Sequence, residues 1–247
     1  MKKNNEKWFP INFQWIPVVK LNNELNIKTN KMKNLLILPM IFLLISISSC
    51  SDDTIIGSGD ITSEFRNVAN FSKVSSEGIF VVNIIQGSSQ SVEIIADNNI
   101  LSKVKSKVVN DELRLYLDNN TFNNISLEAN ITVTRLNSLK NSGAGNMYVR
   151  NIDEPGEFRI NNSGSADILI QGSATSFNIK NEGSGSIEGF DFFVNDCNVE
   201  IDGSGNVKVS CTDNLKVDID GSGSVYYIGN PTIDADISGS GQVINDN

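Results

Sequence analysis

Apolar and polar residues alternate through the second half of the chain. The runs Val199-Glu200-Ile201-Asp202 and Val217-Asp218-Ile219-Asp220 place an aliphatic residue at every second position and an acidic residue after it. A period of two is typical of a β-strand with one buried face and one exposed face. Helical spacing does not occur in this half, so the pattern predicts strands throughout residues 141–247.

A glycine-rich turn separates each run from the next. Its first glycine recurs every 18 to 21 residues, as Gly143, Gly164, Gly183, Gly203, Gly221 and Gly239. The turn reads Gly-Ser-Gly at four sites, Gly-Ala-Gly at Gly143 and Gly-Ser-Ala at Gly164. Repetition at such a period predicts a solenoid, in which each coil buries its apolar face only against its neighbours. We expect glycine here because it adopts positive φ without steric cost, and serine because it hydrogen-bonds the nearby backbone.

The predicted fold class is therefore all-β: a right-handed parallel β-helix, a single-stranded solenoid with Gly-Ser-Gly corners. Right-handedness follows from the chirality of parallel connections. Residues 61–140 are also rich in strand patterns, for example the alternation of Leu113, Leu115 and Leu117, but no repeat is visible. Residues 100–109 fit either a strand with a basic outer face or a short helical turn after Asn99. We expect irregular coils over 61–140 and regular coils over 141–247, forming one domain.

The first 60 residues carry export signals. Met32-Lys33-Asn34 precedes an apolar run, Leu35 to Ile47, which ends at Ser48-Ser49-Cys50. This is a secretory signal, too short for a transmembrane helix. Its end resembles a lipobox, so we predict that Cys50 is acylated; an ordinary signal peptide with a chance cysteine is the alternative. The expected boundaries are a mis-assigned or disordered leader over 1–31, the signal peptide over 32–49, and the lipid anchor and tether over 50–60.

Charge and composition narrow the function further. The chain has 20 basic and 29 acidic residues, and without residues 1–49 its net charge is −14. Such a surface repels nucleic acid. The expected partners are membrane lipid, through the acylated Cys50, and an unknown protein or glycan ligand. Ser51-Asp52-Asp53 fits either a signal for display on the outer face of the outer membrane or a plain polar tether.

Catalytic motifs are absent from the sequence. The chain contains no histidine, which removes Ser-His-Asp and Cys-His catalysis and the usual zinc sites. It also lacks the Gly-x-Ser-x-Gly elbow and the phosphate-binding loops. We therefore predict that the protein is not an enzyme and has no cofactor.

Calcium is the one metal that the sequence suggests. Asp202, Asp220 and Asp236 stand at the same place in successive coils, and Asp234-x-Asp236-x-Ser238 copies the first half of an EF-hand loop. The twelfth loop position is Asn245 rather than glutamate, and strand alternation alone produces this pattern. The alternative is that these carboxylates accept backbone N–H bonds at the bends.

Cys197 and Cys211 remain after Cys50 is used for the anchor. In an exported protein they could form a disulfide. They are only 14 residues apart, less than one coil, so they need not stack on each other. Two small buried hydrophobic residues are the equal alternative.

Together these features resemble the head-GIN-domain family of auto-transporter adhesins. The resemblance covers roughly residues 57–247 and rests on the following segments: Gly57-Ser58-Gly59-Asp60, Phe71…Val74…Gly78-Ile79, Ser91-Val92-Glu93-Ile94…Asp97-Asn98-Asn99, Leu113-Arg114-Leu115 and the Gly-Ser-Gly coils. It implies a right-handed parallel β-helix, export to the cell envelope and lipoprotein anchoring. The family provides no catalytic residues to transfer to this chain.

The sequence thus predicts an outer-membrane lipoprotein, exposed at the cell surface, that acts as a binding module or adhesin through a rigid β-helix. A structural envelope protein without a dedicated ligand is the alternative. A glycan-active enzyme is the third and least favoured hypothesis.

Overall fold

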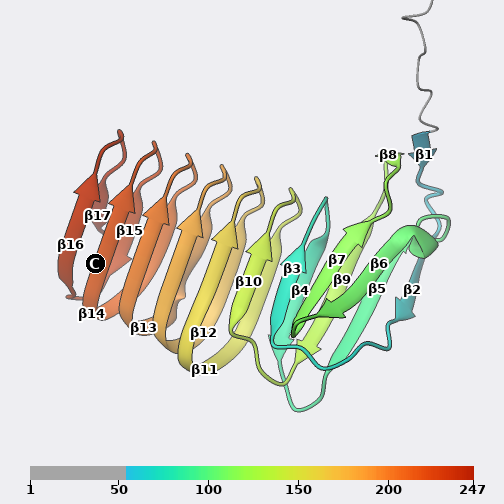
Figure 1. Ribbon diagram of the computed structural model, residues 1–247, viewed down its shortest axis with the longest axis horizontal. Helices are drawn as coiled ribbons and strands as arrows, with labels where there is room; N and C mark the ends of the chain where they lie inside the picture. The colour runs from blue at the N-terminus through green and yellow to red at the C-terminus, as the bar shows by residue number, and fades with distance from the viewer. Residues whose placement is uncertain (1–53) are drawn as a thin grey trace, which may run out of the picture. The chain divides into compact units, whose positions relative to one another are not determined.

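The computed structural model describes residues 54–247 (Figure 1), so Cys50 and the expected leader and signal peptide lie outside the described residues. Strands dominate this region, and it contains no α-helix, only the 3₁₀ turn η1 (Leu101–Lys103). No helix in it is long and apolar enough to cross a membrane. The strands are β1 (Thr54–Ile56), β2 (Ile61–Phe65), β3 (Lys73–Ser76), β4 (Val81–Gln86), β5 (Ser91–Asp97), β6 (Val104–Val109), β7 (Glu112–Leu117), β8 (Thr121–Asn123), β9 (Leu127–Val133), β10 (Ser138–Asn141), β11 (Met147–Asn162), β12 (Ile168–Asn181), β13 (Ile187–Ile201), β14 (Val207–Ile219), β15 (Val225–Ile228), β16 (Thr232–Ile237) and β17 (Val243–Asn245).

The regular half is a parallel solenoid, as predicted. The long strands β11 to β14 pair in parallel, each with the next, and each shows a register shift where the chain bends. Each long strand therefore contributes to two walls. We call wall A the strand segments that precede the glycine turns, with β16, β10, β3, β7 and β6. Wall B comprises the segments that follow the turns, with β15, β17, β4, β9, β5 and β2.

The glycine turns stack backbone on backbone. A Cβ added at Gly183 would lie 1.8 Å from the carbonyl oxygen of Gly164, far closer than any real contact. The same oxygen accepts a hydrogen bond from the N–H of Ser184 at 3.2 Å. Positive φ, the reason expected from the sequence, does not apply to the six predicted turns: the described glycines with positive φ are Gly59, Gly78, Gly172 and Gly229. Close coil-to-coil contact is what requires glycine here.

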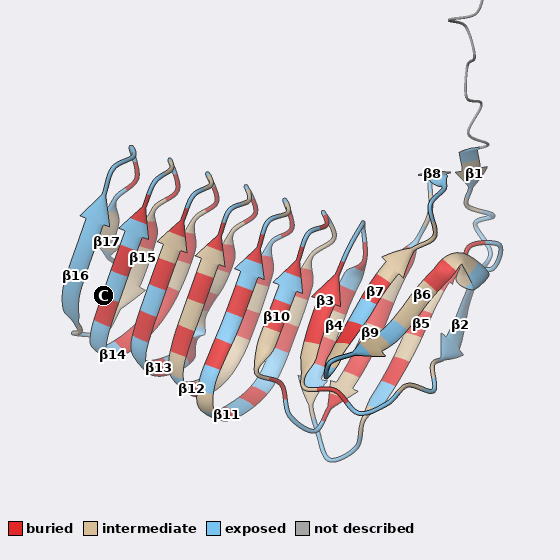
Figure 2. Ribbon diagram, in the orientation of Figure 1, coloured by how far each residue is buried: buried red, intermediate tan, exposed pale blue. Residues whose placement is uncertain are grey.

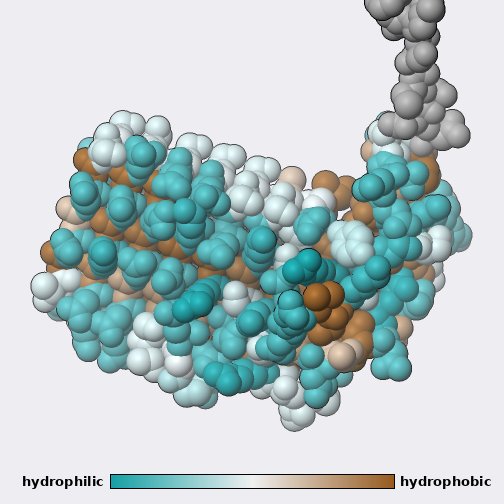
Figure 3. Space-filling view, in the orientation of Figure 1, coloured by the Kyte–Doolittle hydropathy of each residue, from teal (hydrophilic) through white to brown (hydrophobic). Residues whose placement is uncertain are grey.

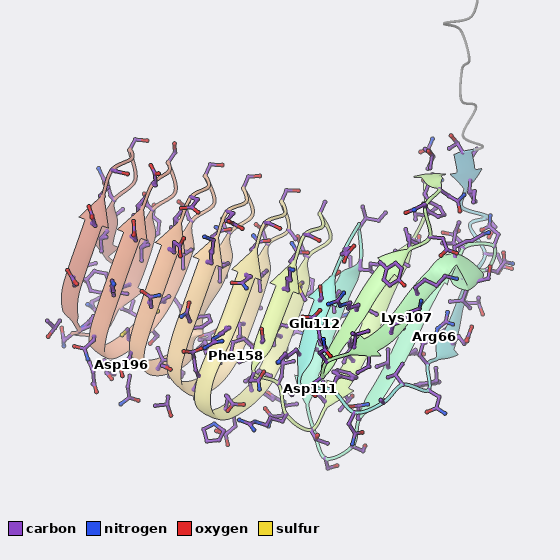
Figure 4. All side chains as sticks on the ribbon, viewed as in Figure 1. Arg66, Lys107, Asp111, Glu112, Phe158 and Asp196 are labelled. Atoms are coloured by element: carbon purple, nitrogen blue, oxygen red, sulfur yellow. The ribbon has the colours of Figure 1, made fainter. Side chains whose placement is uncertain are left out.

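Buried and exposed residues alternate along most strands, as the red bands in Figure 2 show, and the buried side chains form one core between the walls. Phe158 on β11 (Figure 4) and Phe177 and Phe192 of the next two coils pack edge-to-face with one another, with ring centroids 4.8–6.1 Å apart. Because each coil contributes to one continuous core, no coil is stable alone.

The irregular half is also built from coils, but their spatial order differs from their sequence order. Strand β3 pairs with β7 on one side and β10 on the other, and β4 lies between β9 and β11. The coil of residues 73–86 is therefore inserted between those of residues 112–133 and 138–150. This insertion explains why the sequence shows no simple repeat before residue 141.

Antiparallel strands close the N-terminal end. Strand β6 pairs with β7, β5 with β9, and β2 with β5. Residues 100–109 contain both η1 and a strand, so the two structures considered for them both occur. The expected tether over 50–60 is partly folded, because Thr54–Ile56 pairs with Thr121–Asn123 of β8.

Asp97 connects the segment before β2 to the N-terminal end of the solenoid. Its side chain is buried and accepts hydrogen bonds from the N–H groups of Ser126 at 2.7 Å and Gly59 at 2.6 Å. These bonds favour the charged carboxylate and lower the pKa of Asp97. All the described residues belong to one compact unit.

Candidate binding surface

The outer face of wall A is dominated by charged and polar residues. Lys180 lies between three carboxylates: its Nζ atom is 2.5 Å from Glu200, 3.3 Å from Asp202 and 3.4 Å from Glu182. The hydrogen bond to Glu200, above all, raises the pKa of Lys180. Figure 3 shows rows of hydrophilic residues that cross successive coils. These rows are cross-strand neighbours in a parallel stack, and their ion pairs join one coil to the next.

The structure does not assemble the four aspartates into a metal site. Asp202 pairs with Lys180, and Asp220 accepts a hydrogen bond from the hydroxyl of Ser238 at 2.9 Å. Asp234 is opposite Lys216 across the strand pair, and Asp236 is opposite Asp218. Within residues 54–247 no group of three or more acidic or cysteine side chains is placed to hold a metal ion. The partners of Asp202 and Asp220 are side chains, so the expected capping of backbone N–H groups is not seen either.

Cys197 and Cys211 are free thiols, and both are buried. The thiol of Cys211 donates to the carbonyl oxygens of Asn195 and Asn214, each at 3.1 Å. Burial raises the pKa of both thiols. The structure therefore has the cysteines as small buried residues, and the disulfide considered from the sequence is not formed.

The outer face of wall B carries a different set of side chains. One cross-strand row runs over ten strands, from β2 to β17: Phe65, Glu93, Asn130, Asn83, Tyr148, Leu169, Glu188, Lys208, Tyr226 and Ile244. Tyr226 lies in this row while Tyr227 packs against the core. Aromatic and amide side chains, the usual components of binding surfaces, thus lie on one continuous face.

At its N-terminal end this row lines a hollow of about 350 Å³, which we call the wall-B hollow. Phe65 lies at one end of the hollow and is 71 % exposed. Asn83 donates to Asn130 Oδ1 at 3.0 Å, and Asn130 donates to Glu93 Oε2 at 3.4 Å. A second bond from Asn83, at 2.8 Å, reaches Glu128 Oε1. These bonds hold the polar side chains of the hollow in fixed positions.

Arg150 lines the other end of the wall-B hollow, and its side chain is exposed. The described chain has five arginines, and four of them pair with glutamates: Arg66 with Glu64, Arg114 with Glu112, Arg135 with Glu154 and Arg159 with Glu157. Arg150 is the one without a carboxylate partner among residues 54–247. Its guanidinium instead lies over the ring of Tyr148, 5.8 Å from the centroid.

A larger groove, of about 670 Å³, follows the glycine turns from Gly78 to Ser204. It is lined mainly by glycine, serine and alanine, with Ile79 and Glu182 as its larger side chains. The stacking of the turns accounts for these small residues, so the groove gives no independent sign of a ligand. The wall-B hollow, where charge, amides and an exposed ring converge, is the candidate site.

Residues 70–231 match the family described as "Putative auto-transporter adhesin, head GIN domain". The chain belongs to the head-GIN-domain family. The match begins before the coil of residues 73–86 and ends before β16, so it includes most of both walls. No curated protein matches the chain in sequence.

Several solved structures are similar to this head-GIN chain in fold. A "putative adhesin" from Bacteroides fragilis NCTC 9343 is 20 % identical, has a TM-score of 0.66 and aligns over 77 % of this chain and 99 % of its own. A second one, from Parabacteroides merdae ATCC 43184, is 20 % identical with a TM-score of 0.53 over 79 % and 100 %. A "putative lipid binding protein" from Parabacteroides distasonis ATCC 8503 is 18 % identical with a TM-score of 0.51 over 79 % and 100 %. At such identities the likeness concerns the fold alone.

The sequence did not reveal the hollow of this head-GIN chain. Its residues come from β2, β4, β5, β9 and β11, which are neighbours only because the coil of residues 73–86 is inserted out of order. The signals were present separately: a phenylalanine in a polar segment, Ile61–Phe65, and an arginine after a strand of alternating pattern. Only the strand order brings them to one face.

Proposed function

We propose that this protein is a lipoprotein of the outer membrane that acts at the cell surface as a binding module of the adhesin type, and that it binds its ligand in the wall-B hollow. The observation that carries the proposal is Arg150, an exposed arginine without an ion-pair partner in the described chain, beside a hollow that combines amide and carboxylate side chains with an exposed phenylalanine. Exposed aromatic and arginine side chains are enriched at sites that bind partners.

The solenoid suits this role physically. Apart from Phe65 on the edge strand β2, the side chains of the hollow stand on strands that are paired on both sides. Two side-chain hydrogen bonds connect Asn83, Asn130 and Glu93, and a third joins Asn83 to Glu128. A ligand therefore meets a surface that is already ordered, and little conformational entropy is lost on binding.

The anchor would hold this surface close to the membrane. Strand β1 begins at Thr54, four residues after Cys50. Four residues span at most about 14 Å when fully extended. An acyl group on Cys50 would thus keep the N-terminal end of the solenoid near the lipid.

The proposal assigns binding and no catalysis. Glu93 and Glu128, the carboxylates beside the hollow, each accept a hydrogen bond from an asparagine side chain. The chain has no histidine to act as a general base.

Protease treatment of intact cells tests the proposal. We would express the full chain and its Cys50→Ala variant in a Gram-negative host, digest intact cells and measure the protein that remains by immunoblotting. The proposal predicts that the wild type stays with the membrane fraction and is removed by protease, while the variant is lost from the membrane. A wild type that is anchored but protected would face the periplasm, and the structural envelope role would replace adhesion.

A further inference from the structure

The wall-B hollow has an oriented distribution of charge. Arg150 lies on β11 at one end, and Phe65 and Glu93 lie on β2 and β5 at the other. Between Phe65 and Arg150 the sheet makes four strand steps, β2 to β5, β9, β4 and β11. At the spacing of neighbouring strands this corresponds to roughly 19 Å. The polar side chains of Asn130 and Asn83 occupy the middle of that distance.

We infer that the hollow binds a saccharide that carries an acidic group, a carboxylate or a sulfate, with its acidic group on Arg150 and a sugar ring on Phe65. The inference deepens the proposed function and rests on it. It assigns to the hollow a class of ligand: acidic glycans.

Arg150 accounts for the acidic group. Guanidinium groups bind carboxylates and sulfates with paired, charge-assisted hydrogen bonds. The other four described arginines each form an ion pair with a glutamate, so Arg150 is the described arginine whose charge has no carboxylate partner. The net charge of the chain is negative, −9 overall, so attraction to an anion has to come from this one local cation rather than from the long-range field.

Phe65 and the central row account for the sugar. The flat ring of Phe65 is exposed on an edge strand, where an unused apolar side chain promotes aggregation. Stacking on the C–H face of a sugar ring would cover it. Glu93 accepts hydrogen bonds from hydroxyl groups, while Asn130 and Asn83 both donate and accept them. A volume of about 350 Å³ lies within the range of ligand sites.

The position of the hollow on a sheet face argues against an extended peptide. Peptides that bind sheets usually add a strand at a free edge, where backbone groups are unpaired. Strands β5, β9 and β4 have neighbours on both sides, so their backbone N–H and C=O groups are already hydrogen-bonded within the sheet. A ligand on this face must be recognised by side chains, which suits a molecule rich in hydroxyl groups.

A glycan array tests the inference directly. The full chain, purified in detergent, would be applied to an array of glycans bearing glucuronic acid, sialic acid or sulfate, together with their neutral counterparts. We expect binding to a subset of the acidic glycans, with at least tenfold weaker binding to the neutral counterpart of each. Arg150→Ala and Phe65→Ala should each weaken binding at least tenfold, and Arg150→Lys should give an intermediate value.

Matched variants control for nonspecific loss. Arg159→Ala removes an arginine that pairs with Glu157 on wall A, and Phe193→Ala removes a phenylalanine that is 59 % exposed but does not line the hollow. Both should bind like the wild type, and circular dichroism would verify that all variants fold.

An array without signal, equal binding to neutral glycans, or binding that survives Arg150→Ala would overturn the inference. Surface exposure and cell binding are measured separately, so an exposed, adhesive protein with a silent array would disprove the saccharide assignment and leave the proposed function standing.

Discussion

The side-chain amide of Asn162 donates a hydrogen bond to the Oδ1 atom of Asn181 in the next coil, at 3.1 Å. Asn141 donates to Asn162 in the same way at 2.8 Å, so three asparagines form a ladder inside the solenoid. All three are at most 1 % exposed. Asn162 also accepts a hydrogen bond from the N–H of Gly164, so the ladder fixes the start of the glycine turn.

Replacing Asn162 by alanine should destabilise the fold strongly. The amide of Asn141 and the Oδ1 atom of Asn181 would both lose Asn162 as their hydrogen-bond partner. Each buried group left unpaired costs about 1–3 kcal/mol. Urea unfolding measures the change in free energy. Asn178→Ala, on the outer face of the same wall, is the control, and we expect it to stay within about 0.5 kcal/mol.

The asparagine ladder also leads to a second, stricter prediction, for a variant that replaces all three asparagines. In the coils that follow, isoleucines occupy the same place, with Ile201 paired to Asn181 and then Ile219. Replacing all three asparagines by isoleucine removes the donors and acceptors that face one another in the ladder together, so only the backbone groups of the turns, such as the N–H of Gly164, lose a side-chain partner. The triple variant should therefore be more stable than Asn162→Ala, and a less stable triple variant would contradict this account of the ladder.

Gly183→Ala should be among the most damaging conservative changes in the turns. The new methyl group would overlap the carbonyl oxygen of Gly164, so the two coils would have to move apart. Overpacking of this kind costs about 1–3 kcal/mol or more. Thermal unfolding measures it, with Ser184→Ala as the control because Ala144 already occupies the corresponding place in its turn. Equal stability of the two variants would show that backbone contact does not explain the glycines.

How much the sequence predicts depends on whether a residue acts within one coil or between coils. Alternation in Val217-Asp218-Ile219-Asp220 is a local pattern, so it predicted the strand and its faces correctly. The reason for glycine was wrong, because it depends on the distance between Gly183 and Gly164, which no single segment contains. The asparagine ladder has a sequence signal, an asparagine two positions before Gly143, Gly164 and Gly183, but the pairing of these side chains depends on the stacking of coils.

The candidate site was out of reach for a different reason. Phe65 and Arg150 are 85 residues apart in sequence and share a hollow only through the order of strands β2, β5, β9, β4 and β11. That order arises because the chain runs from β9 past the coil of residues 73–86 before it forms β10. Alternation and turn chemistry do not specify this topology.

The crossing that creates this order is held by an ion pair that should be sensitive to acid. Arg135, in the loop from β9 to β10, donates to both carboxylate oxygens of the buried Glu154, at 2.9 and 2.6 Å. The hydrogen bond from Arg135 holds the pKa of Glu154 below its ordinary value. A carboxylate with a lowered pKa stabilises the fold above the unfolded value, about 4.3, and this contribution is lost as the pH falls through the lower, folded value.

Glu154→Gln should therefore reduce stability at pH 7 and flatten the loss of stability between about pH 4.3 and lower pH. Urea unfolding at a series of pH values measures both effects. Glu157→Gln removes the partner of Arg159 in a pair that is exposed, so it should leave the pH profile close to that of the wild type. An unchanged acid limb in Glu154→Gln would show that the pair does not control acid stability.

Lys180→Met should lower the melting temperature, and the decrease should be greater at low salt. Without the ammonium group, Glu182, Glu200 and Asp202 repel one another, and salt screens that repulsion. Lys216→Met is the control, because Lys216 is exposed and makes no ion pair within 4 Å in the described chain. Calcium and EDTA can be added to the same samples: we expect no shift in the wild type, and a rise with calcium would restore the metal hypothesis.

Counting reactive thiols tests whether Cys197 and Cys211 are free and buried. In the Cys50→Ala variant of the full chain, Cys197 and Cys211 are the remaining cysteines. Both are buried with raised pKa values, so a thiolate-specific reagent at pH 8 should find no reactive thiol in the folded protein. After unfolding in guanidinium without a reductant, it should find both. If the unfolded protein also shows none, the two cysteines form a disulfide in the protein as isolated, and β13 and β14 are linked covalently at the bend between the walls.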